Sequence, residues 1–122
     1  MSDEIKPPAH IAVYLDVLGL DLTVEFLLHF GGTELYIPVN SKGRGELVAL
    51  VGDERAAALA ERIDRLPSRV PTGKPWLAEV FQSQGLSVVQ IARRLHVTDV
   101  AVRRWFRQAE AERQRQAQRS LF

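Results

Sequence analysis

Five arginines and several short polar side chains gather in residues 85–107, GLSVVQIARRLHVTDVAVRRWFR. The planar guanidinium of arginine can bind a phosphate or a guanine edge through two hydrogen bonds, which the lysine ammonium cannot do. These residue types therefore favour recognition of a polyanion, above all double-stranded DNA. The side chains that we expect on the DNA-facing side of the second half of this stretch are Thr98, Asp99, Val100, Arg103, Arg104 and Arg107.

Arg103 is the best candidate for contacting a base, because a two-bond contact with guanine gives roughly 1–3 kcal/mol of discrimination. Asp99 can accept a hydrogen bond from the amino group of cytosine, and Val100 can contact the methyl group of thymine. Hydroxyls at helix starts can bind backbone phosphates, and so can the other arginines, for which solvated surface charge is the alternative. The residues in this backbone-contacting set are Ser87, Thr98, Arg93, Arg94, Arg104 and Arg107.

Two short helices joined by a tight turn must position these side chains. Ser87 and Thr98 are suitable N-caps, and His96 stands at the turn, where a left-handed backbone is favoured. Apolar side chains recur at helical spacing, at Ile91, Ala92, Leu95, Val97, Val102 and Trp105 or Phe106. This combination predicts a helix-turn-helix whose second helix enters the DNA major groove. The alternative is an ordinary amphipathic helix pair with a solvated basic face.

Charge is unevenly divided along the 122 residues. Residues 1–84 contain 8 basic and 12 acidic side chains, and residues 85–122 contain 8 arginines and 3 acids, so the two parts carry about −4 and +5. This asymmetry is typical of a polyanion-binding end joined to a non-binding end. The sequence has no cysteine, no signal-peptide pattern and no apolar run of membrane-spanning length. We therefore expect a cytoplasmic protein with no membrane partner.

An enzyme is the alternative from another functional class, and the residue pattern disfavours it. The three histidines, His10, His29 and His96, lack the spacing of metal ligands. No glycine-rich phosphate loop and no activated Ser/His pair is visible. We expect no catalytic site, no metal site and no cofactor.

Local patterns divide the chain into five segments. Residues 1–8 are expected to form a disordered arm, and residues 9–66 a dimerisation domain of helices and a strand. The proline-rich residues 67–75 are expected to be a semi-rigid linker. Residues 76–108 form the helix-turn-helix domain, and residues 109–122 a polar tail that is either helical or disordered. The expected fold is mainly α, with a short strand or a two-stranded ribbon.

Glycines mark the expected helix breaks in the N-terminal part, near Gly19 and Gly52. Shifting the sequence by 33 residues aligns these two glycines, which indicates either a degenerate repeat or a chance similarity of amphipathic helices. If it is a repeat, Leu66–Val70 pairs with the predicted strand Thr33–Ile37, within one chain or across a dimer.

The octapeptide GGTELYIP, residues 31–38, followed by the C-terminal helix-turn-helix, resembles the Mor/C family of phage transcription activators. Members carry a GG-x-x-x-Y-I-P segment, and the resemblance covers roughly residues 15–108. It implies a homodimer built by the N-terminal helices and strand, an imperfect DNA dyad as the binding site, and recruitment of host RNA polymerase. It also implies a strand contact with DNA, for which the dimer interface is the alternative role, at Gly31, Gly32, Thr33, Glu34 and Tyr36.

These observations predict a sequence-specific DNA-binding transcription regulator, most simply a dimeric activator of phage type. A repressor or autoregulator that uses the same DNA-binding dimer is one alternative. An adaptor whose N-terminal half binds a protein partner is another.

Overall fold

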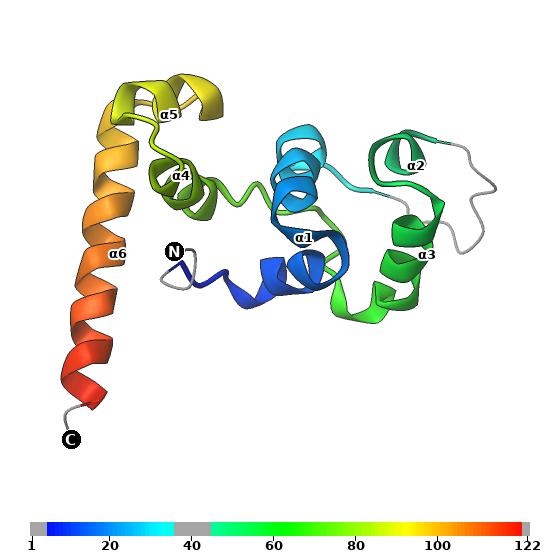
Figure 1. The fold of residues 1–122 in the computed structure, drawn as a ribbon, viewed down its shortest axis with the longest axis horizontal. Helices are drawn as coiled ribbons and strands as arrows, with labels where there is room; N and C mark the ends of the chain where they lie inside the picture. Colours follow the sequence, from blue (N-terminus) through cyan, green and yellow to red (C-terminus); the bar gives the residue numbers. More distant parts are fainter. Residues whose placement is uncertain (1–4, 36–44, 121–122) are drawn as a thin grey trace. The chain divides into compact units, whose positions relative to one another are not determined.

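Helices account for most of the chain in the computed structural model, which describes residues 5–35 and 45–120 (Figure 1). The chain divides into two compact units. The N-terminal unit comprises Pro7–Gly73, and the C-terminal unit comprises Lys74–Phe122 together with Met1–Lys6. The mainly α fold expected from the sequence is confirmed.

The N-terminal unit contains helices α1 (Ala9–Phe30), α2 (Glu46–Val51) and α3 (Asp53–Glu61), followed by the 3₁₀ turn η2 (Ile63–Arg65). Both expected glycine breaks are present. Gly19 interrupts α1 with φ 77° and ψ 173°, and Gly52 separates α2 from α3 with φ 88° and ψ 164°. This backbone region is essentially restricted to glycine, because a Cβ atom would clash with the neighbouring carbonyl.

The core of the N-terminal unit is formed mainly by apolar side chains from the two halves of α1. The rings of Tyr14 and Phe26 lie 4.8 Å apart between centroids, and those of Phe26 and Phe30 lie 5.3 Å apart. Burial raises the pKa of the Tyr14 phenol. The core is completed from α2, α3 and the segment after η2 by Leu47, Val51, Ala56, Leu59, Ala60 and Val70.

An isolated antiparallel bridge joins Glu34 to Arg69, and no strand is present in residues 5–35 and 45–120. The amide of Gly32 donates to the carbonyl of Val70 at 2.7 Å, and the amide of Val70 donates to that of Thr33 at 2.8 Å. The bridge joins the two segments that the 33-residue offset predicts to pair, although the expected strand is reduced to one bridge over its described part. Tyr36 and Ile37 lie outside the described residues.

The proline-rich segment 67–75 differs from the semi-rigid linker that its composition predicts. Val70 is 3% exposed, and its amide and carbonyl are both bonded to the Gly32–Thr33 segment. A Cβ atom on Gly73 would lie 2.9 Å from the Cδ1 atom of Ile11 in α1. Tertiary hydrogen bonds and burial therefore hold residues up to Gly73 against the N-terminal unit.

The C-terminal unit contains α4 (Lys74–Ser83), α5 (Val88–Leu95) and α6 (Asp99–Ser120). Figure 1 shows α6 as one continuous helix, which extends through residues 109–120 of the expected polar tail. The three helices share a buried apolar core made by Trp76, Leu77, Ala78, Val80, Phe81, Ile91, Ala92, Leu95 and Val102. None of the described helices is both long and apolar enough to span a membrane.

Candidate nucleic-acid interface

Side-chain caps define the starts of α5 and α6. The hydroxyl of Ser87 accepts a hydrogen bond from the amide of Gln90 at 3.2 Å, and the side chain of Gln90 accepts one from the amide of Ser87 at 2.8 Å. This reciprocal pair is a capping box, which satisfies two amides that the helix leaves without partners. The hydroxyl of Thr98 accepts a hydrogen bond from the amide of Ala101 at 3.1 Å. Both predicted caps are confirmed.

The turn between α5 and α6 depends on one left-handed residue. His96 has φ 57° and ψ 47°, and it is the one described non-glycine residue with a positive φ. The amide of Val97, the next residue, donates to the carbonyl of Ala92 at 3.0 Å, which closes the end of α5. Ile91 and Val102 are fully buried, so the core holds the two helices together across this turn.

One face of the first half of α6 is left to solvent. Val100 is 63% exposed, and Arg103, Arg104 and Arg107 are all exposed. Residues spaced by three, four and seven positions share a helix face, so these four side chains lie along one stripe. The structure therefore brings together the base-contacting and phosphate-contacting candidates that the sequence places on the second helix.

Asp99 and Arg103 form an ion pair one helical turn apart. Nη1 of Arg103 donates to Oδ2 of Asp99, and the side chains of Arg103 and Asp99 are 51% and 47% exposed respectively. The hydrogen bond from Arg103 lowers the pKa of the Asp99 carboxyl from its ordinary value of 3.8. Asp99 is therefore a carboxylate at neutral pH, and its acceptor oxygens are shared with an arginine.

Arg93 and Arg94 differ in their surroundings although both are exposed on α5. The guanidinium carbon of Arg94 lies 5.0 Å from the centroid of the Phe81 ring in α4, within the range of a cation–π contact. The Arg93 side chain has no partner among the described residues. Arg94 thus has a packing role in addition to any contact with phosphate.

The GGTE segment lies in the N-terminal unit and is held by Arg69. One guanidinium nitrogen of Arg69 donates to the carbonyl of Gly32 at 3.3 Å, and the other lies 3.2 Å from Oε1 of Glu34. The hydroxyl of Thr33 donates to the carbonyl of Phe30 at 2.6 Å. Arg69 therefore offsets the charge of Glu34, which would otherwise repel a phosphate.

Gly31 occupies a tight position at the end of α1. A Cβ atom there would lie 2.5 Å from the carbonyl oxygen of Leu27 and 3.1 Å from that of Pro71. Gly32 has φ 87°, which favours glycine. The backbone geometry at both positions therefore favours glycine. Tyr36, the remaining residue of the predicted strand contact, lies outside the described residues.

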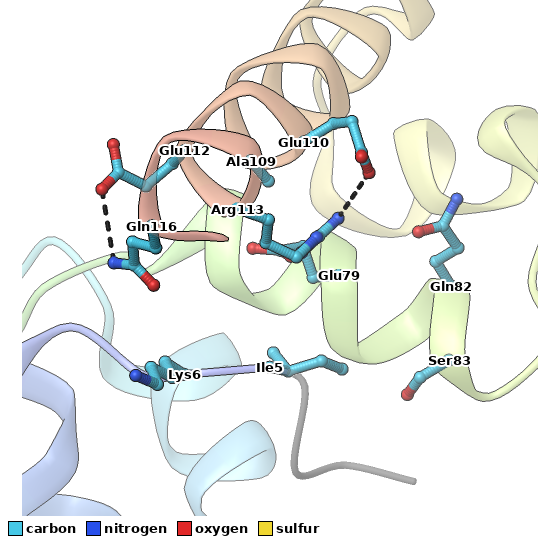
Figure 2. Close-up of a pocket in the computed structure, with 10 residues that line it drawn as sticks. All are labelled: Ile5, Lys6, Glu79, Gln82, Ser83, Ala109, Glu110, Glu112, Arg113 and Gln116. Carbon is cyan, nitrogen blue, oxygen red and sulfur yellow. Dashed lines mark hydrogen bonds and ion pairs between the residues drawn. The ribbon is translucent and has the colours of Figure 1, made fainter. Parts of the chain in front are cut away.

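An ion pair fastens the C-terminal half of α6 to α4, and a second one lies within α6. Nη1 of Arg113 lies 3.0 Å from Oε1 of Glu79 in α4, and Nη2 lies 3.6 Å from Oε1 of Glu110 (Figure 2). The Glu79 carboxylate raises the pKa of Arg113. The Arg113–Glu79 pair holds α6 to α4 well beyond the exposed arginine stripe.

Two residues that matter for this arrangement are not in the set of candidates from the sequence. Gln90 completes the capping box, and the S-x-x-Q spacing from Ser87 is its signal in the sequence. Arg69 holds the GGTE segment, but it lies 35 residues from Glu34. No pattern within a short stretch of sequence predicts a contact over that separation.

No cluster of His, Cys, Asp or Glu suited to a metal ion is present in the part of the chain that the structure describes. Comparison with protein families, with curated proteins and with solved structures finds no match for the chain.

Proposed function

We propose that this protein is a sequence-specific DNA-binding transcription regulator that acts as a homodimer. The C-terminal unit is the DNA-binding unit, α5 and α6 form its helix-turn-helix, and α6 is the helix that enters the major groove. The arrangement of α5, the His96 turn and α6 carries this proposal, because it leaves an arginine-rich helix face exposed while its opposite side is packed in the core.

The residue types on the exposed face support this assignment. Val100 is apolar and 63% exposed. Exposure of this side chain to water is unfavourable, whereas contact with a thymine methyl group suits it. Arg104 and Arg107 have no side-chain partner among the described residues, so their guanidinium groups are available to phosphates. Ser87 and Thr98 stand at helix starts, where the helix dipole favours an anion.

The homodimer is proposed from the size of the binding unit and from the resemblance. A single helix-turn-helix contacts few base pairs, and two units on a dyad give the affinity that regulation needs. The segment GGTELYIP resembles the Mor/C activators, which supports the N-terminal unit as the source of the dimer contact. Sedimentation equilibrium of the purified chain tests this point, and a monomer at micromolar concentration contradicts it.

Footprinting on the DNA upstream of the protein's own coding sequence tests DNA recognition directly. A protected dyad with half-sites about one helical turn apart, or a multiple of it, is the expected result. Gel-shift titrations at several salt concentrations should give a negative slope of log K against log [salt], whose magnitude falls by about 0.9 for each phosphate contact removed, as in Arg104→Ala. Arg119→Ala, at the far end of α6, is the matched control and should keep the wild-type slope. Binding that shows no preferred site contradicts the proposal.

The resemblance favours activation of transcription over repression, and it implies host RNA polymerase as the partner. Transcription in vitro from the footprinted promoter, with and without the protein, decides the direction. Increased transcript supports an activator, whereas decreased transcript assigns the same dimer to a repressor.

A further inference from the structure

Arg103 differs from the other two arginines on the exposed face of α6. Its Nη1 atom is bonded to Oδ2 of Asp99, whereas Arg104 and Arg107 have no side-chain partner among the described residues. The bond leaves the edge formed by Nε and Nη2 of Arg103 without a partner among the residues described. That edge can still form two parallel hydrogen bonds.

The two kinds of DNA contact make different demands on an arginine. A phosphate contact requires only a positive charge close to the phosphate, and a freely rotating arginine side chain can provide it. A two-bond contact with O6 and N7 of guanine needs the guanidinium plane to lie in the plane of the base, so a side chain held in one orientation discriminates better. Among Arg103, Arg104 and Arg107, which share the exposed face of the first half of α6, the tethered Arg103 matches the second demand.

We infer that Asp99 is a positioning residue that orients Arg103 for a two-bond contact with one guanine, and that it does not itself read a cytosine. This inference rests on the proposed DNA-binding function. It assigns guanine as the base read by the first turns of α6 and changes the role that residue type alone predicts for Asp99.

Because Asp99 is charged, its removal should have opposite effects on nonspecific DNA binding and on the preference for guanine. A carboxylate at the start of α6 repels the DNA backbone, so its removal should strengthen binding to DNA of unrelated sequence. Removal should also free Arg103 to rotate and so weaken the preference for guanine. A residue with a merely structural role in α6 would weaken both kinds of binding together when it is removed.

The experiment is a binding selection from a randomised duplex DNA library with the full-length protein, followed by titrations of the selected duplex and of its guanine-substituted versions. Wild type should prefer guanine at one position per half-site by about 5- to 150-fold. Arg103→Ala and Asp99→Ala should each lose most of that preference at the same position, and the double variant should lose no more than either. Asp99→Ala should also bind a scrambled duplex at least as tightly as wild type.

Two further variants keep the result interpretable if Asp99→Ala perturbs α6. Asp99→Asn keeps an acceptor oxygen at the same place and should retain part of the guanine preference. Glu112→Ala removes a carboxylate paired with Arg115 farther along the same helix and should leave the preference unchanged. Circular dichroism of each variant checks that the helices remain.

Three results would overturn the inference. One is a full guanine preference in both Asp99→Ala and Asp99→Asn, and another is a full guanine preference in Arg103→Ala. The third is loss of a cytosine preference at a different position in Asp99→Ala, which would assign direct base contact to the carboxylate. In each case wild type still selects a specific site, so the proposed function stands. If wild type selects no sequence, the proposed function fails and this inference fails with it.

Discussion

The guanidinium of Arg94 in α5 lies 5.0 Å from the ring centroid of Phe81 in α4. Phe81 is 2% exposed, so the cation covers an aromatic ring that belongs to the core of the C-terminal unit. The contact therefore links α5 to α4. Arg94 is therefore expected to contribute to the stability of the unit that we propose binds DNA.

Replacing Arg94 with alanine should lower the free energy of unfolding by about 0.5–1 kcal/mol, the range of an exposed cation–π contact. Urea unfolding followed by tryptophan fluorescence measures this, because both tryptophans, Trp76 and Trp105, lie in the C-terminal unit. Arg93→Ala is the matched control and should change the free energy by less than about 0.5 kcal/mol. Equal effects of the two variants would contradict a specific role for the Phe81 contact.

Gly31→Ala should disturb the pairing of the GGTE segment with Val70, since the new Cβ atom would lie 2.5 Å from the carbonyl oxygen of Leu27. Overpacking of this kind costs about 1–3 kcal/mol. Hydrogen exchange should show faster exchange at the amides of Gly32 and Val70, which pair across this contact. Unchanged protection of these two amides would show that the backbone does not need glycine at this position.

His96→Gly should stabilise the C-terminal unit by up to about 1 kcal/mol, because glycine adopts the left-handed backbone of the turn without the cost that a Cβ atom imposes. His96→Val should destabilise it by about 1–2 kcal/mol, because a branched side chain suits this backbone least. Urea midpoints of the two variants against wild type provide the measurement. A midpoint for His96→Gly well below wild type would indicate that the imidazole makes a stabilising contact.

The Asp99 carboxyl should titrate below 3.8, its ordinary value, and should return toward that value in Arg103→Ala. Glu112 should titrate below 4.5 because of its hydrogen bond from Arg115. A lowered pKa in the folded state means that the carboxylates stabilise the fold above their ordinary values, and that this stability is lost as the pH falls through the lowered values. Carbon-detected NMR titration of the carboxyl groups gives both pKa values. An unshifted Asp99 would exclude the ion pair in solution.

Local sequence was sufficient for the helix pair at the C-terminal end. The caps at Ser87 and Thr98 and the left-handed turn at His96 all depend on residues close together in the sequence. The glycine break at Gly19 in α1 of the N-terminal unit is local in the same way. The Asp99–Arg103 ion pair is equally local, and its spacing of four residues is a signal that sequence analysis can detect.

Other features depended on residues distant in the chain. The Glu34–Arg69 bridge reduces the described part of a predicted strand to a single pair, and burial of Val70 attaches an expected linker to the N-terminal unit. The polar residues 109–120 favour helix by composition, while the Arg113–Glu79 ion pair holds that helix to α4.

The sequence by itself determined where helices start, break and turn, because caps and backbone sterics act within one turn of chain. Tertiary structure decided that Arg69 meets Glu34, that Arg94 lies over Phe81 and that Arg113 meets Glu79, because packing brings these distant partners together.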